Sequence, residues 1–422
     1  MNRGFYAVMA AEFFSSLADN ALLIVAIAIL AQMDSPAWMT PLLRLFFVLS
    51  YVCLAAFVGA FADSMPKGRV MFITNTVKFI GCSMIFLGLH PLIAYAIVGL
   101  GAAAYSPAKY GILTEMLPAD KLVIANGWIE GLTVSSIVLG TVLGGALINP
   151  HVSAFLVGLI HFAEATPAIA ALTVIMIVYI LAAIFNLRIP DPGARYPKQS
   201  FSPVELLKNF YHSFTTLWHD KLGQISLAVT TLFWGAGATL QFIVLKWAQH
   251  SLGLPLDRAA FLQGIVAVGI AIGAVSAAKF IKLKNSLKVM KLGAAMGIVV
   301  MVMTMVHTVW LAYPLLVLVG GLAGFFVVPM NALLQHRGHV LLSAGSSIAV
   351  QNFNENLSIL TMLGVYSLLI ALDLSTNTII ILFGSFVTVM MLLVMYWHAH
   401  NQKIQDSLHL IGEEKRQPAQ PK

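Results

Sequence analysis

Long apolar runs separated by short polar breaks dominate the pattern of this chain. The runs lie at residues 4–33, 39–62, 70–88, 91–113, 122–148 and 164–187, and then at 222–249, 257–281, 288–308, 312–334, 343–371 and 376–398. A helix needs roughly 20 apolar residues to cross the hydrocarbon core of a bilayer, and each run is about that long or longer. The pattern therefore predicts twelve transmembrane helices.

A polar stretch divides these helices into two sets. We predict an N-terminal six-helix half at 1–187, a cytoplasmic linker at 188–221, a C-terminal six-helix half at 222–398 and a cytoplasmic tail at 399–422. The halves are weakly similar, since Gly99–Pro107 lies over Gly321–Pro329, 222 residues later. Parallel repeats of this kind are typical of transporters that open a central site to each side of the membrane in turn.

Composition excludes a soluble globule, because 59% of the residues are apolar and only 10% are charged. The net charge of +7 does not indicate a nucleic-acid partner here, since 19 of the 24 Lys and Arg lie on one alternating set of loops and in the tails. By the positive-inside rule, both termini are expected in the cytoplasm. Cys53 and Cys82 lie inside apolar runs, so we expect two small core residues rather than a disulfide or a metal site.

Carboxylates inside the spans are the first candidates for a functional site. An ionisable group at mid-bilayer costs at least about 2.5–3.5 kcal/mol, so it should face the protein interior and have a partner. In the first span, Glu12 and Asp19 recur at helical spacing, and Asp19 stands about half-way across with Asn20 beside it. Glu355 lies near the middle of the eleventh span. We interpret Asp19 and Glu355 as substrate-site or gate carboxylates, with a structural polar clamp as the alternative.

A polar stripe recurs in the fifth and eleventh spans. Two sets of three residues at i, i+4 and i+7 coincide when the halves are aligned, namely Asn126, Glu130 and Thr133 with Gln351, Glu355 and Ser358. Residues at this spacing face one direction on a helix. For Glu130, a hydrogen bond that joins two helices explains the position as well as a functional role does.

Three lysines also lie within spans. Lys109 is about one turn from the cytoplasmic end of the fourth span, where it either snorkels to the interface or attracts a phosphate or Glu130. We interpret Lys78 as a structural partner of another side chain. Lys246, near the outer end of the seventh span, either snorkels or takes part in a charge pair that closes the outer face. Trp234 lines an apolar cavity or simply packs.

The loop after the second span carries Asp63, Lys67 and Arg69 in the order Gly-x3-Asp-x3-Lys-Gly-Arg. We expect a conformational latch, in which Asp63 caps the next helix while Lys67 and Arg69 face anionic headgroups or a neighbouring helix end. The sequence has no Gly-rich phosphate loop, nucleophile elbow or His pair at metal spacing. We therefore expect neither an enzyme nor a cofactor nor a metal ion.

The same loop resembles the signature of the major facilitator superfamily. Further segments are similar to the bacterial lysophospholipid transporter family of that superfamily, namely Ala18–Leu23, Ala104–Leu113, Phe233–Gly237, Gly324–Pro329 with Asn331–Gln335, and Ile348–Asn352. The resemblance implies an all-α integral membrane protein with the superfamily's architecture of two six-helix halves. It also implies a location in the bacterial inner membrane.

The function implied by this resemblance is the movement of lysophosphatidylethanolamine and lysophosphatidylglycerol from the outer to the inner leaflet, by alternating access. The acyltransferase/acyl-carrier-protein synthetase Aas would reacylate them there. Asp19, Lys109 and Glu355 match family positions thought to bind the headgroup or gate the pathway. Where an arginine is expected in the seventh span, the sequence has Gln241, so we expect Lys246 or a different pair to close the outer gate.

Two sets of residues summarise these expectations for a monomer surrounded by membrane lipids. The substrate-binding set is Asp19, Asn20, Lys109, Tyr110, Trp234, Gln241, Gln351 and Glu355. The gating set is Glu12, Asp63, Lys67, Arg69, Glu130 and Lys246. The alternative function is a proton-coupled efflux antiporter for drugs or other amphiphiles, with Asp19 or Glu355 titrating. A membrane-embedded acyltransferase or a sensor fits less well, because the sequence contains no catalytic pair.

Overall fold

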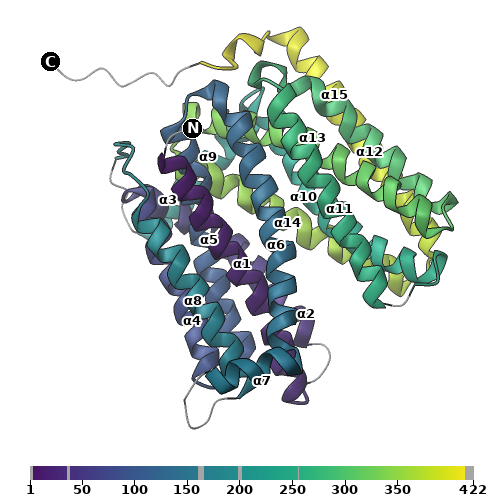
Figure 1. Ribbon diagram of the computed structural model, residues 1–422. Helices are drawn as coiled ribbons and strands as arrows, with labels where there is room; N and C mark the ends of the chain where they lie inside the picture. Colours follow the sequence, from purple (N-terminus) through teal and green to yellow (C-terminus); the bar gives the residue numbers. More distant parts are fainter. Residues whose placement is uncertain (1–2, 36–38, 160–165, 198–201, 255, 414–422) are drawn as a thin grey trace. The chain divides into compact units, whose positions relative to one another are not determined.

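The computed structural model describes residues 3–35, 39–159, 166–197, 202–254 and 256–413, and in these ranges the regular elements are all helices (Figure 1). The α-helices are α1 (Arg3–Gln32), α2 (Met39–Cys53), α3 (Ala55–Asp63), α4 (Lys67–Phe86), α5 (Pro91–Met116), α6 (Leu122–Ile148), α7 (Pro150–Leu159), α8 (Pro167–Leu187), α9 (Pro203–His219), α10 (Gly223–Ser251), α11 (Leu256–Phe280), α12 (Met290–Val302), α13 (Val309–Leu341), α14 (Ala344–Ala371) and α15 (Thr376–Ile404). Short 3₁₀ segments are η1 (Ala119–Lys121), η2 (Leu283–Val289), η3 (Met303–Met305) and η4 (Leu408–Leu410).

The predicted spans correspond to these helices. Eleven helical segments in the described ranges are long and apolar enough to cross a membrane, and α2 with α3, bent by 66°, makes a twelfth if the pair is one span. The prediction of a multi-pass, all-helical membrane protein is thus confirmed. The bend in the second span was not predicted, because the residues around Leu54 continue the apolar run without a proline or glycine.

Helix α9 occupies the linker, where only a polar stretch was expected. Its apolar side chains Leu206 and Leu217 are buried, whereas Lys208 on the opposite side is exposed. This is the pattern of an amphipathic surface helix, whose apolar stripe is diluted by polar residues in a hydropathy reading. The indole of Trp218 stacks on Trp397 of α15, with ring centroids 6.4 Å apart.

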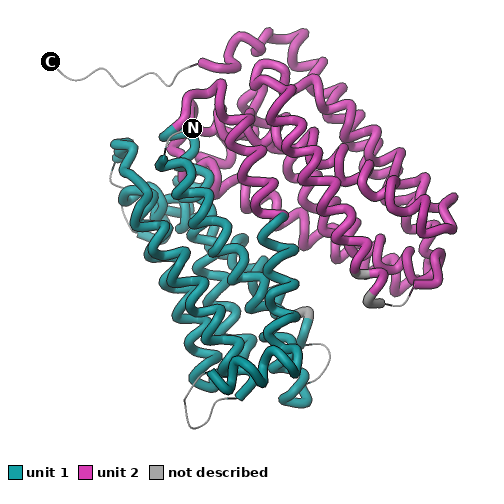
Figure 2. Tube along the Cα trace, in the orientation of Figure 1, with its two compact units in different colours: residues 1–116, 135–210 teal, residues 117–134, 211–422 magenta. Residues whose placement is uncertain are grey.

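The chain forms two compact units (Figure 2). Unit 1 comprises Met1–Met116 and Ser135–Phe210, and unit 2 comprises Leu117–Val134 and Tyr211–Lys422. The units therefore divide α6 between them, whereas the sequence-based halves assign all of α6 to the first half. Of the predicted tail, residues 414–422 lie outside the described ranges.

Unit 1 is a bundle in which α8 packs against α1 and α4, and α5 packs against α2 and α4. Its apolar core includes Leu22, Val25, Tyr95 and Cys82, all buried. The expectation of a core position is confirmed for Cys82 and wrong for Cys53, which is exposed near the end of α2. In a bilayer, an exposed apolar side chain on a spanning helix faces lipid, and hydropathy does not distinguish the two faces.

In unit 2, α13 extends to Leu341, beyond the predicted end at residue 334. Arg337 lies in this extension with only 3% exposure, and its guanidinium donates to both carboxylate oxygens of Asp220 at 3.1 and 2.8 Å. His336 accepts a hydrogen bond from the backbone N–H of Gly412 at 2.9 Å. The extension is therefore an interior polar junction rather than the expected cytoplasmic loop.

Glycines allow α11 and α13 to pack with their backbones close together. Any Cβ at Gly273 would collide with the backbone of Gly321, and one at Gly324 would collide with that of Ile270. Small residues permit this close approach. The resulting van der Waals contacts stabilise helix association in a membrane, where the helices and the lipid are equally apolar. This contact between α11 and α13, the α11–α13 seam, fixes the position of α13, which carries several buried amides.

We predict that Gly273→Val lowers the thermal unfolding midpoint of the purified protein by about 5 °C, because overpacking a close seam costs about 1–3 kcal/mol. Gly264→Val is the matched control, since Gly264 lies on the same helix and a Cβ at that position would meet open space. The two midpoints are compared by a thermal shift measurement in detergent. Equal midpoints would show that the seam has no such tight contact.

Candidate functional site

Asp19 on α1 is held by groups from two neighbouring helices of unit 1. Lys78 Nζ on α4 lies 2.6 Å from Asp19 Oδ2, and the Tyr179 hydroxyl on α8 donates to Oδ1 at 2.7 Å. Lys78 also donates to the Ser15 hydroxyl at 2.9 Å, and Ser15 donates to the Asn75 amide oxygen at 3.0 Å. All five side chains are buried. Asp19 is thus a paired carboxylate at the junction of three helices.

A second buried ion pair joins α1 to α5. Lys109 Nζ lies 3.0 Å from Glu12 Oε1 and 4.3 Å from the ring centroid of Tyr110. Lys109 is only 8% exposed, so the snorkelling interpretation is wrong. Glu12 and Asp19 are two helical turns apart on α1, which places both pairs along one helix. Asn20, half-buried on the same helix, donates to the carbonyl of Ser16 at 2.8 Å.

The loop cluster of unit 1 is also buried. Lys67 lies 2.5 Å from Asp63 and 3.4 Å from Glu115, and the Tyr196 hydroxyl donates to Glu115 at 2.9 Å. Lys67 is 1% exposed and donates to the Ala62 carbonyl at the end of α3, so of the two predicted surroundings it meets a neighbouring helix end rather than headgroups. Arg69 is exposed. Sequence reasoning missed Glu115 and Tyr196, because their positions in the chain give no sign that they meet Lys67.

Unit 2 contains a chain of buried polar groups. Asn331 on α13 donates to Glu130 on α6 at 3.2 Å and accepts from the Gln351 amide on α14 at 3.2 Å. The Gln351 amide also donates to Glu355 at 2.8 Å. One turn further along α13, Gln335 and the amide of Asn126 exchange hydrogen bonds at 2.8 and 2.9 Å. The predicted stripes of α6 and α14 therefore both meet α13.

Asn331 and Gln335 were not among the predicted site residues, although both lie in segments that resemble the family. They are uncharged, and a hydropathy reading gives an amide little weight. Asn331 and Gln335 are four residues apart, as are Asn126 and Glu130. This equal spacing is the sequence signal that the two pairs of side chains meet.

Some buried polar atoms of unit 2 have no hydrogen-bond partner within the described part of the chain, among them Thr231 Oγ1, Trp234 Nε1 and Gln351 Oε1. Thr231 and Trp234 are three residues apart on α10, so they share a face of that helix. Helix α10 packs against α14, and Gly235 adjoins Ser358, which is one turn from Glu355. An unsatisfied buried polar atom costs about 1–3 kcal/mol, so a polar ligand that reached these atoms would gain affinity.

The predicted outer gate is represented by Gln241 and Lys246 on α10. The Gln241 amide donates to Gln263 Oε1 on α11 at 3.0 Å, and the Gln263 amide donates back to the Gln241 carbonyl at 3.1 Å. Lys246 is half-buried and has no ion-pair partner among the residues that the structure describes. An amide pair thus occupies the position at which a charge was expected.

Comparison with known proteins identifies the family. The model of the Major Facilitator Superfamily matches residues 8–360. Proteins named lysophospholipid transporter LplT are 42% identical to the chain in Pectobacterium carotovorum, over 89% of this chain and 88% of that protein, and 44% identical in Serratia proteamaculans, over 87% and 89%. The chain belongs to the LplT family of the major facilitator superfamily. In Escherichia coli, the protein of that name is 41% identical over 94% of this chain and 96% of its own length.

Solved structures agree on the fold of this LplT family member. A bacterial homologue of the iron transporter ferroportin, in an outward-facing state, has a TM-score of 0.70 at 15% identity and covers 95% of this chain and 100% of that chain. The transporter FucP, in an outward conformation, has a TM-score of 0.70 at 12% identity, with coverage of 94% and 99%. The predicted fold class and family are confirmed, and the relatives are transporters rather than enzymes.

We predict that Lys78→Met destabilises unit 1 by about 3–5 kcal/mol, because it leaves the Asp19 carboxylate buried without its cation. Adding Asp19→Asn should restore most of the stability, since the double variant has no uncompensated charge. Chemical unfolding in detergent measures both changes.

Arg195→Gln is the matched control, because Arg195 forms an equally short ion pair, at 2.6 Å to Asp191, with side chains that are 63% and 39% exposed. Arg195 lowers the pKa of Asp191 to about 2, so this exposed pair is charged at neutral pH. Solvent screens an exposed pair, so we expect a much smaller loss of stability. Equal losses for Lys78→Met and Arg195→Gln would contradict the structural importance of the buried pair.

Proposed function

We propose that this protein moves lysophospholipids, chiefly lysophosphatidylethanolamine and lysophosphatidylglycerol, from the outer to the inner leaflet of the bacterial inner membrane by alternating access. The observation that carries the proposal is the likeness to proteins named lysophospholipid transporter LplT, at 41–44% identity over about nine-tenths of the chain. In this proposal the protein acts as a monomer, and the separate acyltransferase Aas reacylates the product.

The buried ion pairs of unit 1 support a charged headgroup as ligand. Asp19 with Lys78, and Glu12 with Lys109, each combine a carboxylate and an ammonium in an apolar surrounding. The headgroup of lysophosphatidylethanolamine carries the same two charges, an ammonium and a phosphate. It can therefore open such a pair and replace it charge for charge, without leaving an uncompensated charge in a low-dielectric interior. Lysine is a good point-charge partner for phosphate.

Unit 2 supports the same class of ligand through its amides. Trp234 offers an indole N–H and Gln351 offers an amide oxygen, and both atoms are buried without a partner among the described residues. A phosphate oxygen can accept from the former, and an ammonium or glycerol hydroxyl can donate to the latter. We assign Glu355, which Gln351 contacts at 2.8 Å, to the same substrate site.

We assign gating to the polar clusters that join helices. Asp63, Lys67 and Glu115 join the loop after α3 to the end of α5, and Glu130 joins α6 to α13 through Asn331. Such clusters have discrete paired and unpaired arrangements, which suits an element that changes partners between two states. Glu12, Lys246 and Arg69 complete the proposed gating set.

Proteoliposomes that contain the purified protein should take up labelled lysophosphatidylethanolamine faster than empty vesicles, and faster than diacyl phosphatidylethanolamine of the same chain length. The measurement is made with and without an imposed proton gradient. A lack of uptake in both conditions would exclude the lipid substrate. Uptake that collapses with the gradient, together with transport of unrelated amphiphiles, would instead favour the proton-coupled antiporter.

Asp19→Asn and Glu355→Gln should each reduce uptake by about tenfold to a hundredfold, because a hydrogen bond to a charged group contributes about 1.5–3 kcal/mol. Asp19→Asn leaves the Lys78 ammonium buried without its carboxylate, so uptake is compared under conditions in which both variants insert and elute as a single species on size exclusion. Glu205→Gln, at an exposed carboxylate on α9, is the control and should transport normally. Wild-type uptake by both site variants would remove these carboxylates from the mechanism.

A further inference from the structure

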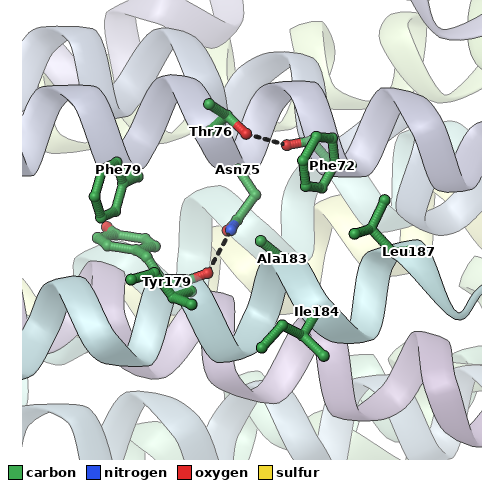
Figure 3. A pocket seen from close by; sticks show the side chains of 9 residues that line it. Phe72, Asn75, Thr76, Phe79, Tyr179, Ala183, Ile184 and Leu187 are labelled. Carbon is green, nitrogen blue, oxygen red and sulfur yellow. Dashed lines mark hydrogen bonds between the residues drawn. The ribbon is translucent and has the colours of Figure 1, made fainter.

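A groove of about 260 Å³ runs between α4 and α8 of unit 1 (Figure 3). Phe72 and Phe79 line it from α4, and Ala183, Ile184 and Leu187 line it from α8. The lining is almost entirely apolar. Pockets for drug-sized ligands typically measure about 300–1,000 Å³, so this groove is small for such a ligand, and its apolar lining suits part of an acyl chain.

The groove is open to the surroundings of the protein along α8. Ile180, Ile184 and Leu187 line it and are 46%, 41% and 65% exposed. Both helices are long and apolar enough to span a membrane. The exposed side of this groove therefore faces the acyl chains of the bilayer.

Exposed cations stand at one end of the groove. Gly68 at the start of α4 lies against Ile189, which follows the end of α8. Arg69 and Arg188 are the next residues on each side of this contact, and both are exposed. Arg69 precedes the lining residue Phe72 by three residues, about 4.5 Å along the helix axis, and Arg188 directly follows the lining residue Leu187.

Asp191, an acidic residue near Arg69, already has an arginine partner. Asp191 lies close enough to Arg69 for the guanidinium to lower its pKa, but its main partner is Arg195, whose Nη2 lies 2.6 Å from Asp191 Oδ2. Arg69 and Arg188 thus add positive charge at the level where the spans end. Arginine binds phosphate well, because its planar guanidinium is weakly hydrated and can donate two parallel hydrogen bonds.

We propose that this groove binds an anionic glycerophospholipid of the surrounding bilayer, with one acyl chain between α4 and α8 and the phosphate at Arg69 and Arg188. The acyl chain gains van der Waals packing in the groove rather than hydrophobic burial, because lipid tails are as apolar as the groove. The headgroup charge therefore decides which lipid binds. Arg69 also belongs to the proposed gating set, but retention of a lipid at this site does not require transport and is measured separately from it.

The bound acyl chain would stabilise the environment of Asp19. Asn75, which lines the groove, donates to the Tyr179 carbonyl at 2.9 Å (Figure 3). The Tyr179 hydroxyl in turn donates to Asp19. A lipid that fills the groove holds α4 and α8 at a fixed separation, and these helices carry both partners of Asp19. Because it binds only the folded state, the lipid raises the stability of the protein.

The test measures lipid retention by the purified full chain, with native mass spectrometry and thermal unfolding in detergent. The probes are phosphatidylglycerol and phosphatidylcholine with identical acyl chains. We expect the wild type to retain one phosphatidylglycerol in preference to phosphatidylcholine, and to unfold at a higher temperature with it. Arg69→Gln combined with Arg188→Gln should weaken phosphatidylglycerol retention roughly tenfold and abolish the preference.

Ala183→Phe, which fills the groove, should reduce retention of both lipids. The matched controls are Lys121→Gln, at another exposed cation, and Leu181→Phe, at a position on α8 that is 37% exposed and does not line the groove. Both should behave as the wild type. If Ala183→Phe fails to fold, the double arginine variant, which changes only exposed side chains, still decides the matter.

An unchanged phosphatidylglycerol preference in the double arginine variant would overturn the proposal. So would a loss of retention in the control variants that equals the loss in Ala183→Phe. Displacement of phosphatidylglycerol by lysophosphatidylethanolamine, with lost uptake in the groove variants, would instead assign the groove to the transported lipid. Failure of the uptake assay alone leaves the retention result unaffected, so the two proposals fail separately.

Discussion

Charged side chains within apolar helices must be paired, and this constraint governs the arrangement of both units. The cost of an isolated charge in a bilayer is at least about 2.5–3.5 kcal/mol, which is a large fraction of the stability of a typical domain. Asp19 meets Lys78, Glu12 meets Lys109, and Asp220 meets Arg337, each within 3.0 Å. The first two pairs join two helices each, and the third joins α13 to the turn between α9 and α10, so each pair selects one packing among many that are equally apolar.

The pairs require the helices to be held at fixed depths and separations. In unit 2, the glycines of α11 and α13 let these helices pack backbone to backbone, and α13 in turn presents Asn331 and Gln335 to α6. In unit 1, α4 and α8 together enclose Asp19 through Lys78 and Tyr179. Close packing therefore positions the polar groups, and the polar groups make that packing specific.

Such pairing also suits a protein that changes state. A buried ion pair is stable only while both partners remain, so a ligand with matching charges can exchange with it at modest cost. The unpartnered atoms of Trp234 and Gln351 within the described residues add positions where a polar ligand gains affinity.

Hydropathy alone placed the spanning helices, because apolar runs of this length have no other stable environment than lipid. It did not reveal the bend between α2 and α3, or the amphipathic α9, since neither changes the mean polarity of its segment enough. The predicted run that ends at residue 334 also left Arg337 in a loop between spans, whereas the structure buries it in an extension of α13. The two carboxylates Asp19 and Glu355 stood out by sequence, since an acid in mid-span demands an explanation.

The sequence by itself determined the class of protein, the spans, the family and the polar residues that lie within the spans. Only the tertiary structure decided which of these residues meet. Lys67 lies inside a cluster with Glu115 and Tyr196, although headgroups were one of its two predicted surroundings. Lys109 pairs with Glu12, although local sequence placed it where snorkelling is possible. The physical reason is that pairing depends on helices far apart in the chain, whose mutual rotation and depth follow from side-chain packing and are absent from any local pattern.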